Sequence, residues 1–462
     1  MFDPTLADIR FGTGLSPQTT IPVSVDAMLS GLQGPDRMAQ RFPIEPYDQF
    51  RVRIRDFNEA RRLYRRNRGK ADQEKYDQAR KKIARASRNA YGDMFRSAFL
   101  RRIHTETGFR ERISFFWQDH FTARGKSTIA KRATGPYVEE AIRPNITGKF
   151  EDLLIASVTH PLMLAYLDQF QSVGPDSKTA KRAAERGRTR GLNENLAREV
   201  LELHTLGVSS GYAQDDVRQL AELFTGLTID RELAFKFDPS MSEPGAETIL
   251  GQLYGRDAEL GNIKDALRDL ARHPDTARHI ADKLCRHFIS DQPDPILVGE
   301  VAAAYRDTDG QLMQVYAALL SHPMSWQSAP EKVKRPFDFM ATALRALDIG
   351  NATLSRTRTN DLRNILYAPL QIMGQPWEAP NGPDGWPEDN AHWITPQFMA
   401  ARLQWALAAP QALRRALPDP RDFARAALSD RLPRDVAFVA EAAENRWEGI
   451  ALVLTSPAFQ RQ

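Results

Sequence analysis

The segment Asn193–Gly207, NENLAREVLELHTLG, carries titratable side chains at positions where an amphipathic helix should be apolar. On a helical wheel with about 100° per residue, Glu199 and His204 fall inside the apolar arc. We expect Glu199 to be buried and hydrogen-bonded, because an unpaired buried carboxylate is costly or takes up a proton. His204 lies about 140° from Glu199 on the wheel, so the two side chains cannot hold the same ligand.

A catalytic cluster is one interpretation of these residues. It joins Arg198, Glu199 and Glu202 with Trp117 and His120 of the upstream sequence ERISFFWQDHF. A histidine beside paired carboxylates can perform general acid–base catalysis, and Arg198 can hold an anionic substrate through two hydrogen bonds. The chain has no HExxH zinc motif, phosphate-binding glycine loop, nucleophile elbow or dinucleotide fingerprint. We therefore expect no metal and no cofactor.

An architectural interpretation stays open beside the catalytic one. Glu194, Arg198 and Glu202 are spaced four residues apart, which places them on one helix face as successive ion pairs. Such networks perturb ionisation without taking part in catalysis. In this interpretation His204 is a core histidine, and His120 bonds a backbone carbonyl group or a carboxylate.

A second candidate site lies in the stretch Gly374–Trp393, GQPWEAPNGPDGWPEDNAHW. A loop of this length without regular structure is either functional or packed as a lid. Aromatic rings there can stack on sugars while polar neighbours bond the hydroxyl groups. The ligand-binding residues of this interpretation are Trp377, Trp386, Trp393 and His392, with Asp384 and Asn390 between them. The alternative is that the tryptophans pin the loop onto the helices, and their large apolar area favours such packing.

Apolar residues recur at helical spacing in nearly every long segment, and alternating β-branched runs are almost absent. The predicted fold is all-α, a large multi-helix, bundle-like domain with the Trp-rich loop as a lid. Phe235 and Phe237 alternate within residues 227–251, which predicts a short hairpin or an ordered loop. We expect a basic N-terminal helical region at residues 1–110 and a helical core at residues 111–462, which can together form one continuous domain.

The net charge of the 462-residue chain is only +4, but Lys and Arg crowd its first two hundred residues. The basic helical stretch 51–102 is either a solvated face or a dock for an acidic partner, an anionic polymer or a membrane surface. Cys285 is the only cysteine, so no intrachain disulfide can form. The sequence shows no secretory signal, and no apolar run approaches the roughly 20 residues that span a bilayer. The expected location is therefore the cytoplasm.

Residues 193–226 form a pattern of two helices joined by a turn. Asp215 and Asp216 stand in the first turn of the second helix, where they complement the helix dipole. In a DNA-binding helix-turn-helix protein this end enters the major groove, and two carboxylates there would face phosphate. We therefore do not expect a nucleic-acid partner.

The same residues, NENLAREVLELHTLGVSSGYAQDDVRQLAELFTG, resemble the central signature of the bacterial family called domain of unknown function 1800. Further segments resemble that family in the same order: ERISFFWQDHF, HPDTARHIADKLCRHF, MGQPWEAPNGPDGWP and LTSPAFQRQ. The resemblance implies a large, mainly helical protein without an established reaction. It also implies an envelope role and a partner protein exported by the twin-arginine route, so export with that partner is an alternative to the cytoplasm.

The chain departs from the family pattern at several positions. Ser242, Glu243 and Glu247 stand where the family commonly has His, Asp and Lys, so a family site built on that histidine would be absent here. Ala213 stands where the family usually has Thr before the second helix, which removes a helix cap worth roughly 1 kcal/mol. His204 stands where the family often has Phe, which favours its core interpretation.

These observations predict an envelope-associated or partner-dependent factor with a buried His/Glu/Arg cluster that can be an active site. One alternative is a glycan-binding or scaffold protein that uses the Trp-rich loop and the basic helices. The other is a hydrolase-type enzyme that uses His120 and the paired carboxylates.

Overall fold

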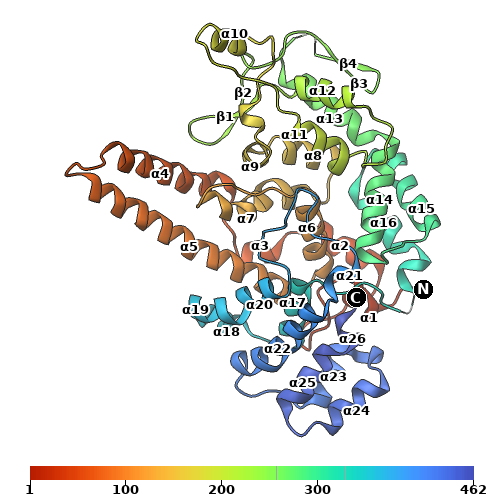
Figure 1. Cartoon of the computed structure of the whole chain (residues 1–462). Coiled ribbons are helices and arrows are strands. Elements are labelled where there is room, and N and C mark those ends of the chain that lie inside the picture. The colour runs from red at the N-terminus through yellow and green to blue at the C-terminus, as the bar shows by residue number, and fades with distance from the viewer. Residues whose placement is uncertain (256, 328) are drawn as a thin grey trace.

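Helices supply nearly all of the regular structure. The computed structural model describes residues 1–255, 257–327 and 329–462. Within these ranges the strands form two short antiparallel hairpins (Figure 1). The predicted all-α class is confirmed, because the hairpins are small additions to a helical body.

The N-terminal part begins with short helices and ends in a long helical hairpin. Its elements are α1 (Pro4–Leu6), η1 (Ala7–Phe11), α2 (Val25–Gln33), α3 (Arg37–Arg41), α4 (Tyr47–Arg66) and α5 (Gln73–His104). The helices α4 and α5 pack against each other and project from the rest of the molecule (Figure 1). The chain reverses between them where Gly69 has a φ of 77°, a conformation that glycine adopts without side-chain strain.

The middle of the chain supplies the helices around residues 193–226. Its elements are α6 (Gly108–His120), η2 (Ala130–Arg132), α7 (Thr134–Tyr137), η3 (Val138–Ile142), η4 (Arg143–Asn145), α8 (Phe150–Val158), α9 (Pro161–Tyr166), η5 (Gln169–Gln171), α10 (Lys178–Ala184), α11 (Asn195–Glu199), η6 (Val200–His204) and α12 (Gln214–Leu223). The first signature helix is not uniform, because α11 continues into η6, which is a π-helix. Wide turns of this kind are rare and are frequently found at functional sites.

Two hairpins occupy the region where the sequence predicts a hairpin or an ordered loop. In the first, β1 (Leu227–Ile229) pairs with β2 (Phe235–Phe237), and Phe235 stands opposite Ile229. In the second, β3 (Glu247–Ile249) pairs with β4 (Gln252–Tyr254). The hairpin prediction is confirmed for β1 and β2.

The remainder of the chain is again helical. It contains α13 (Leu260–Arg272), α14 (Pro274–Phe288), α15 (Pro295–Asp307), α16 (Leu312–Ser321), η7 (Pro323–Trp326), α17 (Pro336–Ala346), α18 (Asn351–Arg356), α19 (Thr359–Leu362), η8 (Arg363–Tyr367) and α20 (Ala368–Ile372). After the Trp-rich loop follow α21 (Asn390–Trp393), α22 (Pro396–Leu413), α23 (Pro420–Leu428), η9 (Ser429–Arg431), α24 (Arg434–Ala442), α25 (Arg446–Thr455) and α26 (Pro457–Gln460).

Buried apolar side chains form two cores that meet at α5 and α6. The first core draws on residues from Leu6 to Trp326, and the second draws mainly on α5 and residues 333–459. Met94 belongs to the first core whereas its neighbour Phe95 belongs to the second, and Phe115 of α6 also faces the second. The N-terminal residues 1–110 therefore contribute to both cores.

A buried arginine ties the N-terminal helices to α6. Arg143 donates two hydrogen bonds to the carboxylate of Glu111, at 2.8 and 3.0 Å, and two more to Asp36. Burial alone would raise the pKa of Glu111, but Arg143 lowers it to about 2. Such a pair stabilises the fold only while both partners are present, because either charge alone would be buried without compensation.

The variant Arg143→Met should lose about 3–5 kcal/mol of unfolding free energy, because it leaves Glu111 buried without its cation. The measurement is urea unfolding at neutral pH. Arg143→Met combined with Glu111→Leu should recover part of that loss. A loss below about 1 kcal/mol in the single variant would contradict this account of the ion pair.

Candidate functional site

Helix α6 places His120 at the junction of several segments. Trp117, on the face of α6 that packs in the core, fixes the helix. It is fully buried, and its indole N–H donates to the Tyr316 hydroxyl group at 2.6 Å. His120 is 2% exposed, and its Nε2 donates to the backbone oxygen of His204 at 3.2 Å. The Nδ1 atom of His120 is buried and has no partner among the described residues.

Three histidines meet at this junction. The ring centre of His120 lies 5.9 Å from that of His204 and 6.3 Å from that of His279. His279 donates to the backbone oxygen of Leu203 at 3.0 Å. His120 and His279 are therefore both hydrogen-bonded to the backbone near the end of η6. Burial, and next the charge of Lys283, lower all three pKa values, to about 3 for His204 and about 4 for His279. The three rings are therefore neutral at neutral pH.

Lys283 stands between the histidines and a group of carboxylates. It follows His279 by four residues on α14, so the two side chains share one helix face. The side chain is half-buried and makes no hydrogen bond or ion pair within residues 1–255, 257–327 and 329–462. Burial lowers its pKa, and the carboxylates of Asp119, Glu388 and Asp384 oppose that effect. An unpaired lysine of this kind is a candidate for catalysis.

The neighbouring carboxylates are held by Arg335. This residue donates to Asp119 at 2.7 Å and contacts Glu388 at 2.8 Å. His287 donates from Nδ1 to the same oxygen of Glu388 at 2.9 Å. Burial raises the pKa of Asp119 despite Arg335, whereas the pKa of Glu388 is lowered because Arg335 and His287 outweigh its burial.

The Trp-rich loop reaches α6 at Gly385. The backbone N–H of the next residue, Trp386, donates to Asp119 at 2.8 Å. Gly385 has a φ of 82°, and a Cβ atom there would lie 2.5 Å from an oxygen of Asp119. Only glycine allows this close approach, which brings Asp384 to the site.

Glu199 lies on the other side of Asp384. Its side chain is half-buried, and burial, followed by the charges of Glu202 and Asp384, raises its pKa to about 7. The carboxylate of Asp384 thus influences both Glu199 and Lys283. Tyr166 faces the same pair, because burial and the charges of Glu199 and Asp384 raise the pKa of its hydroxyl group.

The structure separates residues that the sequence places in one catalytic cluster. His120 bonds the backbone oxygen of His204, and within the described residues it makes no hydrogen bond or ion pair with Glu199 or Glu202. Glu199 is half-buried and has no hydrogen bond in the described part of the chain, contrary to the expectation of a buried, bonded carboxylate. The reason is that neighbouring segments cover this part of the helix face only partly.

The architectural interpretation of the signature helix is confirmed for its ion pairs. Arg198 contacts Glu202 and Glu194 at 3.3 Å each, as the spacing of four predicts. Ser242, at the position of the family histidine, donates to the backbone oxygen of Thr225. Ala213, at the position of the family threonine, donates its backbone N–H to Asp216 at 2.8 Å.

The three tryptophans of the Trp-rich loop are buried, and ligand binding by this loop stays a prediction. Trp377, Trp386 and Trp393 are 7%, 9% and 1% exposed, and the last donates its indole N–H to Pro387 at 2.9 Å. Their ring faces are covered because the indoles pack into the second core, as the alternative interpretation expects. His392 is exposed and lies edge-on to Trp393.

Sequence reasoning did not select Lys283, Asp119 or Glu388. Asp119 directly precedes the selected His120, and Lys283 follows His279 at helical spacing in the segment HPDTARHIADKLCRHF. The closeness of Asp119 to His120, and of Lys283 to His279, in the sequence was a local sign that these residues share a site. The role of Glu388 had no local signal, because its partner Arg335 lies in a different segment.

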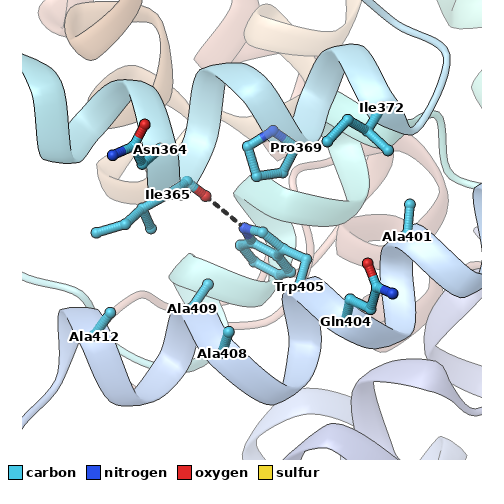
Figure 2. A pocket seen from close by; sticks show the side chains of 10 residues that line it. All are labelled: Asn364, Ile365, Pro369, Ile372, Ala401, Gln404, Trp405, Ala408, Ala409 and Ala412. Atoms are coloured by element: carbon cyan, nitrogen blue, oxygen red, sulfur yellow. Dashed lines mark hydrogen bonds between the residues drawn. The ribbon is translucent and has the colours of Figure 1, made fainter.

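The structure has one cavity next to the site and another that is separate from it. A polar cavity of about 760 Å³ between α14 and α15 has His279 in its wall. Figure 2 shows an apolar cavity of about 210 Å³ between α20 and α22, where the Trp405 indole N–H donates to Ile365 at 2.8 Å. This second cavity has few groups for chemistry.

A family model described as "Protein of unknown function (DUF1800)" matches residues 10–461. The chain belongs to this family. No curated protein and no solved structure matches it. The DUF1800 match thus includes every element of the junction at Asp119, His120, Glu199, Lys283 and Asp384.

Outside positions 256 and 328, no group of three or more His, Cys, Asp or Glu side chains is arranged to hold a metal ion. No helix within the same ranges is long and apolar enough to cross a bilayer.

The variant Glu199→Gln should stabilise the fold at about pH 8 and change it little at about pH 5. The folded-state pKa of about 7 lies above the ordinary 4.5, so the proton contributes stability below pH 4.5 that is lost as the pH rises through 7. We expect a gain of about 1–2 kcal/mol at the higher pH, after discounting for partial exposure, by urea unfolding.

The matched control is Glu194→Gln, which changes a carboxylate whose contacts with Arg198 and Gln214 are solvent-accessible. Its effect should stay below about 1 kcal/mol and be equal at both pH values. The same pH-independent result for Glu199→Gln would show that Glu199 does not titrate near neutrality.

Proposed function

We propose that this chain is a hydrolase-type enzyme that works by acid–base chemistry at the junction of α6, α11, α14 and the Trp-rich loop. One observation carries the proposal: Asp384 of the loop influences both Glu199 and the unpaired Lys283. Asp384 thus links a carboxyl group whose pKa is near neutrality to an amine whose pKa is lowered by burial, and such a set of groups is suited to proton transfer.

Each group has a distinct role in this proposal. Glu199 accepts a proton from an attacking water molecule and later returns one to the leaving group. Lys283 supports negative charge that develops on the substrate, since no carboxylate of the described residues forms an ion pair with it. His120 and Asp119 are positioning residues, because the first bonds the His204 backbone and the second holds both Arg335 and the loop.

Activity should depend on Glu199 and Lys283. The experiment screens chromogenic esters, phosphate esters and glycosides with the full-length chain. For a substrate that turns over, Glu199→Gln and Lys283→Gln should each lower kcat/KM by roughly 100-fold or more. Glu194→Gln is the control and should retain activity. An unchanged rate in Glu199→Gln would refute its acid–base role.

A polyanion-binding role is the second candidate, and the projecting helical hairpin favours it (Figure 1). Residues 61–88 contain twelve Lys or Arg and three Asp or Glu residues, a net charge of +9. Most of the basic side chains there are exposed. A projecting segment of this charge attracts an anionic polymer through long-range electrostatics. The envelope role and the partner exported by the twin-arginine route stay predictions from the family resemblance.

The variant with Arg65, Arg66 and Arg68 changed to Gln should elute from a dextran sulfate column at a lower salt concentration than the wild type. Screening by salt weakens such binding, so the elution point reports the electrostatic contribution. The matched control changes three arginines of the C-terminal helices, Arg421, Arg425 and Arg434, to Gln. Equal elution of the two variants would assign the retention to net charge alone.

A further inference from the structure

A small cavity under the Trp-rich loop is not used by the proposed reaction. Its volume is about 50 Å³, and residues of α5, α6 and η3 form its walls together with Trp377 and Glu378. It shares Gln118 and Glu378 with a smaller cavity that reaches Asp119 and Trp386. A water molecule needs about 10–15 Å³ of such space, so the cavity accommodates one small polar group of a ligand.

Hydrogen-bonding groups without partners gather on this cavity. Trp377 Nε1, Glu378 Oε2 and Arg102 Nη2 are buried and unpaired within the described ranges. The side chains of these residues are 7%, 7% and 3% exposed. The amide group of Gln118 on the same wall also makes no hydrogen bond inside those ranges. Because buried polar groups are nearly always paired, the three buried groups on one cavity indicate a ligand that bonds them, and the half-buried Gln118 adds a fourth hydrogen-bonding group.

The loop is held in an unusual conformation at this point. Glu378 has a φ of 51°, a left-handed backbone conformation that is strained for a non-glycine residue. The backbone of Gly135 bonds its carboxyl group, and a Cβ atom at Gly135 would lie 3.0 Å from Oε1. Burial, followed by the charge of Glu139, raises the pKa of Glu378 to about 8, so at neutral pH the group can both donate and accept.

The charges around the cavity are already balanced by ion pairs. Each cation on the wall has a carboxylate partner, and the pairs are Arg101 with Glu139, Arg102 with Asp338, and Arg143 with Glu111. A charged ligand would add an uncompensated charge to this buried site, which is costly. A hydroxyl group donates and accepts at once, and the wall offers donors at Trp377 and Arg102 and both functions at Gln118 and Glu378.

We propose that this cavity binds a neutral, hydroxyl-bearing ligand of the sugar or polyol type, with hydrogen bonds to Trp377, Glu378, Arg102 and Gln118. The Trp-rich loop then recognises the ligand through an indole N–H group and a carboxyl group, while the ring faces stay packed in the core. This binding does not depend on the proposed acid–base reaction.

The experiment follows the indole N–H signals of the full-length chain by NMR during titration with glucose. The signal of Trp377, identified by its loss in Trp377→Phe, should shift in a saturable way. The Trp393 signal should not move, because its N–H already bonds Pro387. Glucuronate is the charged comparison and should bind at least tenfold more weakly.

The variant Gln118→Leu removes one hydrogen-bonding group without stranding a charge, and it should weaken glucose binding about tenfold. An unchanged Trp393 signal in this variant reports that the loop keeps its structure. A Trp377 signal that does not shift with glucose, or that responds only to glucuronate, would overturn the proposal. Equal glucose affinity in Gln118→Leu and the wild type would overturn it as well.

Discussion

The buried ion pair between Asp119 and Arg335 holds the two cores and the Trp-rich loop in one arrangement. Asp119 lies near the end of α6, which packs largely in the first core, and Arg335 directly precedes α17 of the second. Removing two charges from water is costly, so such a pair persists only when further hydrogen bonds satisfy it. Trp386 and Glu388, both from the loop, supply those contacts. The loop is therefore placed by electrostatics as well as by its indoles.

The same dry environment sets the chemistry of the junction. Burial keeps His120, His204 and His279 neutral, and it lowers the pKa of Lys283. Burial has the opposite effect on the carboxyl group of Glu199, whose pKa rises to about 7. The pKa values of Glu199 and Lys283 are thereby shifted toward neutrality from opposite sides, which favours proton transfer, whereas those of the three histidines are shifted away from it.

The loop serves two different neighbourhoods of α6. At Gly385 it approaches Asp119 and carries Asp384 to the proposed reaction centre, and at Glu378 it closes the small cavity that contains Gln118. The two neighbourhoods lie on one continuous segment, so a ligand in the cavity would contact the loop that places Asp384. One loop therefore contributes residues both to the small cavity and to the charged groups around Asp384.

Local patterns in the sequence were sufficient for the fold class and for contacts within one helix. The spacing of four between Glu194, Arg198 and Glu202 predicts ion pairs because neighbours on a helix face meet whatever surrounds them. The wheel also separates His204 from Glu199. The same wheel could not show that the helix becomes a π-helix at Val200, nor that the packing around it leaves Glu199 half-buried.

Contacts between distant segments were decided only by the tertiary structure. A sequence gives the direction of His120 on its own helix but not the segment that it faces, and the structure places it against His204 and near Lys283. The same holds for the partners Asp119 and Arg335, 216 positions apart. Helical periodicity follows from short-range backbone hydrogen bonds, whereas the meeting of two helix faces depends on how the whole chain packs. The sequence thus determined the helices and the candidate groups, and the packing of α6, α14 and the loop decided which of those groups share a site.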